Sequence, residues 1–109
     1  MSITPDLIQQ VWEKGTPVLG QDPNLWRLDS IGRLIYRFAH GDRWSMYGWE
    51  VDHIIPVAKG GSDYPWNLQP LHWRENAAKQ DNLLQALVQL SRPATLASGD
   101  PLFRALMNQ

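Results

Sequence analysis

Four polar residues in the middle of the chain have types and spacings that could support acid–base and metal chemistry. Asp52 and His53 are adjacent at the end of an apolar run. Asn67 follows His53 by 14 positions, and Asn76 follows Asn67 by nine. A histidine titrates near neutral pH, so it is suited to accept a proton from water as a general base. The carboxylate of Asp52 and the side-chain carbonyl of Asn76 are hard oxygen donors, which favour Mg²⁺ or Mn²⁺ over zinc.

A strand, a long loop, a second strand and a helix would have to position these residues. The run "GWEVDHII" is rich in β-formers and predicts a strand that ends at the acid–imidazole pair. The loop over Pro56–Trp66 is broken by prolines and glycines, and "NLQPL" is a short extended segment after it. A helix is expected from about His72, with one face that carries Trp73, Ala77, Leu84 and Leu87.

Helical and hairpin segments flank this ββα unit. "TPDLIQQVWEKG" predicts a short helix, with Thr4 as the N-cap and Gly15 as the stop, and "TPVLGQDPN" predicts a linker. "LWRLDSIGRLIYRFAHGD" predicts a hairpin in which a strand has one solvent-exposed face; an amphipathic helix over Leu28–Phe38 is the alternative. "DPLFRALMNQ" predicts a last helix, with Asp100 as its N-cap. The alternation that predicts the strand sets Leu34, Tyr36 and Phe38 against Arg33, Ile35 and Arg37.

The composition limits the class of protein. A chain of 109 residues is the size of one domain, so we expect a single domain over residues 1–109, with a motif core at about 48–90. The absence of cysteine excludes disulfides, thiolate catalysis and cysteine-based zinc sites. No apolar run is long enough to span a membrane, and no basic-then-apolar leader is present, so we expect a cytoplasmic protein.

The charge of the chain is unevenly distributed. The net charge is −1, but residues 27–43 carry four arginines against two aspartates. A basic hairpin next to an acidic centre would suit a phosphate ligand that approaches a metal site, and an ordinary solvated strand face is an equal alternative.

The segments "DHIIPVAKGG", "NLQPL" and "NAAK", in this order, resemble the HNH (ββα-metal) endonuclease family, in its small cysteine-free bacterial or phage form. The resemblance covers roughly residues 48–82 and implies an α+β fold: a ββα-metal core with a preceding β-hairpin and flanking N- and C-terminal helices. It implies a metal-dependent endonuclease that hydrolyses DNA phosphodiester bonds with low sequence specificity, by nicking or double-strand cleavage.

The resemblance also implies a role for each motif residue. His53 would activate water, Asp52 and Asn76 would hold one divalent ion, and Asn67 would brace the loop and orient the histidine. Many members have histidine at the position of Asn76, and others bind a structural zinc through four cysteines. The asparagine and the lack of cysteine therefore favour Mg²⁺, with Mn²⁺ or another transition ion as alternatives, and require tryptophans 49, 66 and 73 to supply packing.

Further residues are candidates for the surroundings of the site. Glu50 is two residues before Asp52 on the same strand face, where it would lie behind the metal or pair with an arginine. His72 shares a helix face with Asn76 and could approach the metal, although a helix-start histidine that faces solvent is the preferred interpretation. The tryptophans are expected in the core rather than as base-stacking surfaces. The expected nucleic-acid contacts are Lys59, Arg37, Arg43, Arg74 and Lys79.

Two other functions remain open at this stage. One is a catalytically silent nucleic-acid-binding module. The other is a nuclease toxin or phage component controlled by an inhibitor or another partner protein, with the apolar "PLFRALMNQ" as a contact surface, although packing of this segment on the core is preferred. The expected substrate is double-stranded DNA, and the expected state is a monomer or weak dimer. The sequence does not indicate the target site, the choice between DNA and RNA, the physiological ion or the pathway.

Overall fold

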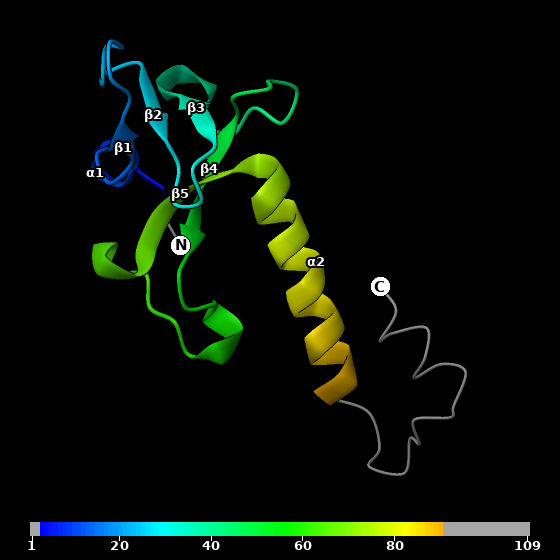
Figure 1. Cartoon of the computed structure of the whole chain (residues 1–109). Coiled ribbons are helices and arrows are strands. Elements are labelled where there is room, and N and C mark those ends of the chain that lie inside the picture. The colour runs from blue at the N-terminus through cyan, green and yellow to red at the C-terminus, as the bar shows by residue number, and fades with distance from the viewer. Residues whose placement is uncertain (1–2, 91–109) are drawn as a thin grey trace. The chain divides into compact units, whose positions relative to one another are not determined.

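The computed structural model describes the backbone of residues 3–90 and the side chains of residues 3–82 (Figure 1). Its class is α+β, as expected from the sequence. Among the described residues, those up to Asn76 form one compact unit and those from Ala77 belong to a second, so all the strands, α1 and the first turn of α2 belong to the first unit. The main elements are α1 (Pro5–Trp12), β1 (Thr16–Pro17), β2 (Trp26–Leu28), β3 (Leu34–Tyr36), β4 (Trp49–His53), β5 (Leu68–His72) and α2 (Trp73–Leu90).

The strands form two antiparallel sheets. β1, β2 and β3 pair in that order, and β4 pairs with β5 from Trp49 opposite His72 to His53 opposite Leu68. The hairpin of β2 and β3 is confirmed and the helical alternative is wrong. β1 was not expected, because "TPVLGQDPN" is dominated by turn formers. On β3 the fully buried residue is Ile35, whereas Leu34 is exposed, so the apolar alternation did not identify the buried face.

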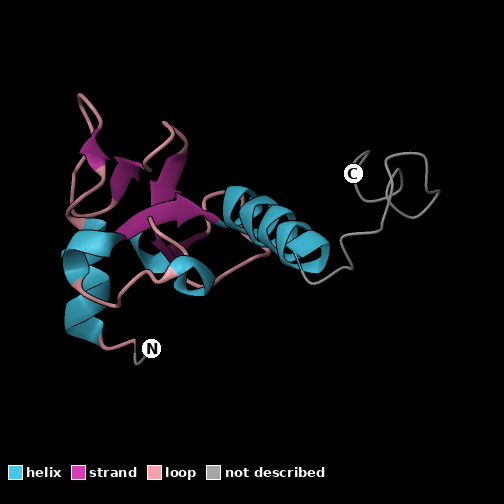
Figure 2. Cartoon of the chain, turned by 90° about the horizontal axis from the view of Figure 1, so that it is seen from below, coloured by secondary structure: helices cyan, strands magenta, loops and turns pink. Residues whose placement is uncertain are grey.

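The first helix begins as its capping residues predict, but it ends at Trp12, with Glu13 as its C-cap, before the expected stop at Gly15. The Thr4 hydroxyl accepts a hydrogen bond from the backbone N–H of Leu7 (3.2 Å), and Pro5 occupies the first turn, where a missing N–H costs nothing. Val11 and Trp12 are its buried residues. Through them α1 packs against β5, alongside the strands (Figure 2).

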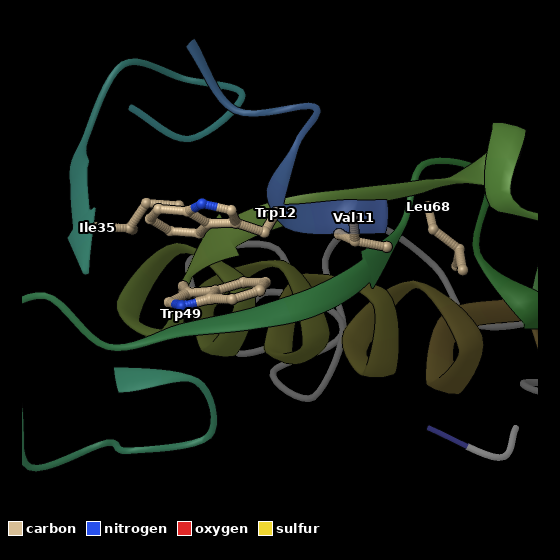
Figure 3. Packing of buried hydrophobic residues seen from close by; sticks show 5 residues of the cluster. All are labelled: Val11, Trp12, Ile35, Trp49 and Leu68. Atoms are coloured by element: carbon tan, nitrogen blue, oxygen red, sulfur yellow. The ribbon is translucent and has the colours of Figure 1, made fainter. Parts of the chain in front are cut away.

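A pair of tryptophans forms the centre of the small core (Figure 3). The ring centroids of Trp12 and Trp49 are 5.3 Å apart with tilted planes, an arrangement favoured by aromatic quadrupoles. Each indole N–H is satisfied: Trp12 donates to the carbonyl of Pro23 (3.0 Å), and Trp49 donates to the carbonyl of Tyr36 (2.9 Å). Fully buried Val11, Ile35 and Leu68 complete the cluster.

The sequence predicts that the tryptophans lie in the core, but two of them do not. Trp66 is 64% exposed and Trp44 is 99% exposed, so for these two the expectation is wrong. Trp73 is half-buried and donates its indole N–H to the carbonyl of Ser45 (2.9 Å). The core is too small to enclose six indoles, and Trp12 and Trp49 take its centre.

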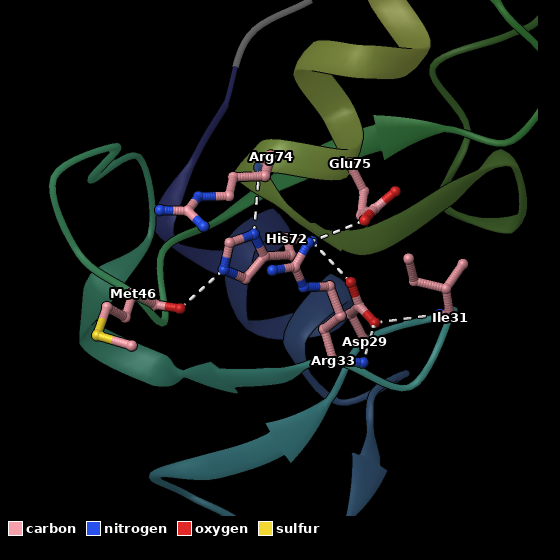
Figure 4. A network of polar contacts seen from close by, with 7 residues as sticks. All are labelled: Asp29, Ile31, Arg33, Met46, His72, Arg74 and Glu75. Carbon is pink, nitrogen blue, oxygen red and sulfur yellow. Dashed lines mark hydrogen bonds and ion pairs between the residues drawn. The ribbon is translucent and has the colours of Figure 1, made fainter.

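The start of α2 is fixed by a buried network around His72 (Figure 4). The His72 backbone N–H donates to Asp29 Oδ2 (2.8 Å), and its ring Nδ1 accepts the backbone N–H of Arg74 (3.1 Å), which caps the helix. Its Nε2 lies 2.8 Å from the Met46 carbonyl. His72 is 2% exposed, so the expectation of a solvent-facing histidine is wrong. Protein groups engage both ring nitrogens, which leaves neither to bind a metal ion.

The expected last helix, "DPLFRALMNQ", and the side chains of Leu84 and Leu87 lie outside the described residues. Within residues 3–90, no helix is both long and apolar enough to cross a bilayer.

Candidate active site

The last two residues of β4 present the acid and the imidazole. Asp52 is 7% exposed, and its Oδ2 accepts a hydrogen bond from the amide of Gln69 (2.8 Å), its partner across the β4–β5 ladder. Because side chains alternate along a strand, Asp52 and Glu50 share one face of β4 and His53 points to the other. The expected divergence of Asp52 and His53 thus follows from the observed strand.

His53 contacts a carboxylate that the sequence did not single out. Its Nε2 lies 2.7 Å from Asp63 Oδ1, and the His53 side chain is 19% exposed against 54% for Asp63. Asp63 is the one acidic residue between His53 and Asn67, and this is the signal that could have identified it. The sequence did not predict this contact, because it forms only when the loop after β4 folds back toward the end of that strand.

Asn67 pins the long loop after β4. Its side chain is fully buried; the Oδ1 atom accepts from the Ile55 N–H (2.8 Å), and Nδ2 donates to the carbonyls of Ile55 (3.0 Å) and Ser62 (2.7 Å). The backbone carbonyl of Asn67 also accepts from the Ile54 N–H (2.7 Å). One amide therefore satisfies backbone groups from both ends of the loop, which would otherwise be unpaired.

The loop is also held from the turn that follows α1. The Lys14 ammonium donates to the carbonyls of Pro65 and Leu68, which flank Asn67, and the distance to Leu68 is 2.8 Å. Partial burial lowers the pKa of Lys14. Gly61 makes the closest backbone approach: a Cβ there would lie 1.7 Å from the Ile55 carbonyl oxygen and 2.9 Å from Asn67 Nδ2. Only glycine fits between these groups without displacing them.

Asn76, in the first turn of α2, contacts the strand through Glu50. The residue is 4% exposed, and its Nδ2 donates to Glu50 Oε1 (2.7 Å). Arg43 binds the same carboxylate in a bidentate manner, with Nε to Oε2 and Nη2 to Oε1 both at 2.8 Å. The hydrogen bond from Arg43 lowers the pKa of Glu50 against a rise from partial burial, and the bond from Asn76 lowers it further. The same carboxylate raises the pKa of Arg43.

Asp52 and Asn76 are suited to bind a hard divalent ion. Among the side chains of residues 3–82, no group of three or more histidine, cysteine, aspartate or glutamate residues could hold a metal. Magnesium does not require one, since it commonly takes one or two protein ligands and completes its shell with water and substrate phosphate. Alternate residues of a strand are about 7 Å apart, so Asn76, bonded to Glu50, approaches the face that carries Asp52. The bond to Glu50 uses the amide nitrogen, and the carbonyl oxygen is the atom suited to ligation.

The expected nucleic-acid contacts differ in what they bind within the protein. Arg43 pairs with Glu50, and Arg37 donates to the side chain of Gln9 (2.9 Å). Arg74 is exposed and lies over the Trp73 ring at 5.3 Å, and Lys59 is exposed beside Gly60. Lys79 belongs to the second compact unit and is half-buried.

The basic hairpin therefore does not present four unengaged arginines. Besides Arg37 and Arg43, Arg33 pairs with Glu75 (2.8 Å) and Arg27 donates to the carbonyl of Gly15 (2.9 Å). Each arginine of residues 27–43 therefore contacts protein groups, which argues against a phosphate-binding surface formed by unengaged arginines.

Comparison with known proteins supports the resemblance. A family model described as HNH endonuclease matches residues 38–82, a segment that contains Asp52, His53, Asn67 and Asn76. Neither the curated proteins nor the solved structures gave a match. The match begins after β3, so α1 and the three-stranded sheet lie outside it.

Proposed function

We propose that this protein is a metal-dependent endonuclease that hydrolyses phosphodiester bonds in DNA, because residues 38–82 match the HNH endonuclease family model, which indicates a nuclease-type function. The observation that supports it best is the arrangement around β4. A partly accessible imidazole ends the strand, and a buried carboxylate and a buried amide share its other face. This is the combination of a base and two oxygen ligands that such hydrolysis requires.

His53 acts as the general base in this proposal. Its imidazole accepts the proton of the attacking water, and the contact with Asp63 limits the rotation of the ring. Asn67 acts indirectly: its bonds to both ends of the loop fix the position from which Asp63 reaches His53. We assign Asn67 as a positioning residue.

Asp52 and Asn76 hold the cation. When bound, a divalent ion supplies positive charge to the phosphate oxygens and to the leaving 3′-oxygen. The two residues offer one negative charge and one neutral carbonyl oxygen, and we propose Mg²⁺ as the ion, with Mn²⁺ as a substitute.

The proposed substrate is double-stranded DNA, cut or nicked with low sequence specificity. Lys59 is exposed beside Gly60, which has a φ of 87° and no side chain, so DNA can approach the backbone closely there. Arg74 is exposed at the start of α2. Contacts of this kind are made with phosphates and carry no sequence information. By the family resemblance, the products would carry 5′-phosphate and 3′-hydroxyl ends.

A plasmid assay tests the proposal. The purified chain is expected to nick supercoiled DNA with Mg²⁺ or Mn²⁺ and to lose the activity in EDTA. His53→Ala should lower the rate by about 10²–10⁴-fold, the usual contribution of a general base. Asp52→Asn should raise the metal concentration needed, whereas Asp81→Asn, which neutralises an exposed aspartate on α2, should change neither quantity.

Two results would contradict the proposal. Cleavage by His53→Ala in EDTA at the unsubstituted rate would indicate a contaminating nuclease or a different mechanism. Retention of DNA without nicking, across a panel of divalent ions, would instead identify a nucleic-acid-binding module.

A further inference from the structure

The contact between Glu50 and Asn76 has a chemical direction. An asparagine amide has one end that donates and one end that accepts, and only the carbonyl oxygen can bind a hard cation. The amide of Asn76 is buried, and at 2.7 Å from a carboxylate oxygen it can only present its NH₂ group. The opposite orientation would place two oxygens against each other.

Glu50 itself is held in place. Arg43 donates to both of its carboxylate oxygens, and one of these oxygens also accepts from Asn76. The carboxylate is therefore saturated with donors on the side of Arg43 and Asn76. Although Glu50 shares a strand face with Asp52, these bonds place it as an acceptor for protein groups rather than as a cation ligand.

We infer that Glu50 is a positioning residue, which orients the amide of Asn76 so that its carbonyl oxygen is presented to the divalent ion, and that Arg43 fixes Glu50 for this role. The inference rests on the proposed function, because it concerns the same metal site. It assigns to Glu50 an effect on the cation that is transmitted through Asn76 and not through direct ligation.

A double-mutant cycle on metal binding separates these two effects. Mn²⁺ affinity is measured by calorimetry on the full chain without DNA, for the unsubstituted protein, Glu50→Gln, Asn76→Ala and the double variant. A glutamine can accept or donate, so it no longer selects one orientation of the amide. Loss of such outer contacts typically costs about 10–100-fold in metal affinity. We expect about tenfold weaker binding for Glu50→Gln. In the Asn76→Ala background, where no amide remains to be oriented, the same substitution should change the affinity by less than about threefold.

Glu75 supplies the matched control. It is the neighbour of Asn76 on α2 and pairs with Arg33 at 2.8 Å, so Glu75→Gln removes the same charge next to the same ligand without touching its amide. Its Mn²⁺ affinity should stay within about twofold of the unsubstituted value, as expected for a partly exposed pair. Thermal melting of the metal-free variants confirms that each is folded.

The outcomes distinguish the inference from the proposed function. Equal losses of affinity from Glu50→Gln in both backgrounds would overturn the inference, because Glu50 would then act through its charge or as a ligand. No loss in either background would also overturn it and leave the contact purely structural. If the unsubstituted chain binds Mn²⁺ but does not nick DNA, the nuclease proposal fails while the cycle still decides the role of Glu50. If it does not bind Mn²⁺ at all, both fail.

Discussion

At the scale of single residues, the contact between His53 and Asp63 fixes the orientation of the imidazole. The 2.7 Å separation of Nε2 and Oδ1 is that of a strong hydrogen bond. A ring held in this way spends less time in unproductive orientations, and a carboxylate assists a catalytic histidine in this manner.

Replacement of Asp63 should therefore slow the reaction without affecting the metal. We expect Asp63→Ala to lower the single-turnover nicking rate by about tenfold, less than the usual 10²–10⁴-fold contribution of a general base, because Asp63 only orients the ring. Mn²⁺ affinity should be unchanged, since the proposed metal ligands are Asp52 and Asn76 and do not include Asp63. Asp63→Asn, which keeps an acceptor oxygen, is the matched variant and should lose less. A faster rate for Asp63→Ala would mean that the carboxylate blocks the reactive nitrogen.

The sequence indicates candidate site residues, but it does not indicate which residues contact them. Residue type and spacing singled out Asp52, His53, Asn67 and Asn76, and the family match includes all four. Their partners could not be predicted, because these come from distant parts of the chain: Arg43 reaches Glu50, and Asp63 reaches His53. The burial of His72 was missed for the same reason, since Asp29 and Met46 are its partners.

At the scale of elements, the loop between β4 and β5 has one position where space is decisive. Gly61 lies against the Ile55 carbonyl and the Asn67 amide, so any side chain there must displace a group that pins the loop. Gly60, its neighbour, has a φ of 87°, but a Cβ added there would have no neighbouring atom within 4 Å. An alanine at Gly60 therefore meets a backbone penalty and no clash.

The two glycines give a matched pair of substitutions. We expect Gly60→Ala to cost about 1–2 kcal/mol, the penalty for a left-handed residue with a Cβ. Gly61→Ala should lower the free energy of unfolding by about 3 kcal/mol or more, because it breaks buried hydrogen bonds of Asn67. Urea denaturation measures both. Equal costs would show that the loop adjusts around Gly61 and that Asn67 does not constrain it.

Elements with local signals were predicted well. Thr4 and Pro5 set the start of α1, and the β-branched and aromatic residues of β4 predicted a strand. β1 has only two residues and exists because it pairs with β2, which no local pattern specifies. The buried face of β3 was likewise set by packing, where Ile35 joins the core cluster.

At the scale of the whole molecule, His40 links stability to pH. Its ring makes an edge contact with Trp49, with centroids 4.9 Å apart. Burial lowers the pKa of His40 below 6.5, and the charge of Arg37 adds to this, while Glu50 opposes it. The unfolded chain therefore binds this proton at a higher pH than the folded chain does.

The free energy of unfolding is therefore expected to fall at acidic pH. The contribution of neutral His40 should be complete above pH 6.5 and decline as the pH falls through and below that value. Urea denaturation at about pH 7.5 and about pH 5.5, on either side of that value, should give a lower free energy of unfolding at the acidic pH, and His40→Gln should reduce the difference. An unchanged difference in this variant would assign the acid sensitivity to other groups.

The bonds of Lys14 extend the loop's support beyond the segment that matches the family. The carbonyls of Pro65 and Leu68 lie on either side of Asn67, and both take their donor from a residue that precedes the matched segment by more than twenty positions. A carbonyl deprived of its donor must find water or another N–H group. A chain that shares the motif but has no equivalent of Lys14, in the turn after α1, would thus have to pair these carbonyls with water or another N–H group. Comparison of such chains at this point would show whether the segment that carries Lys14 is an optional addition or a component of the catalytic framework.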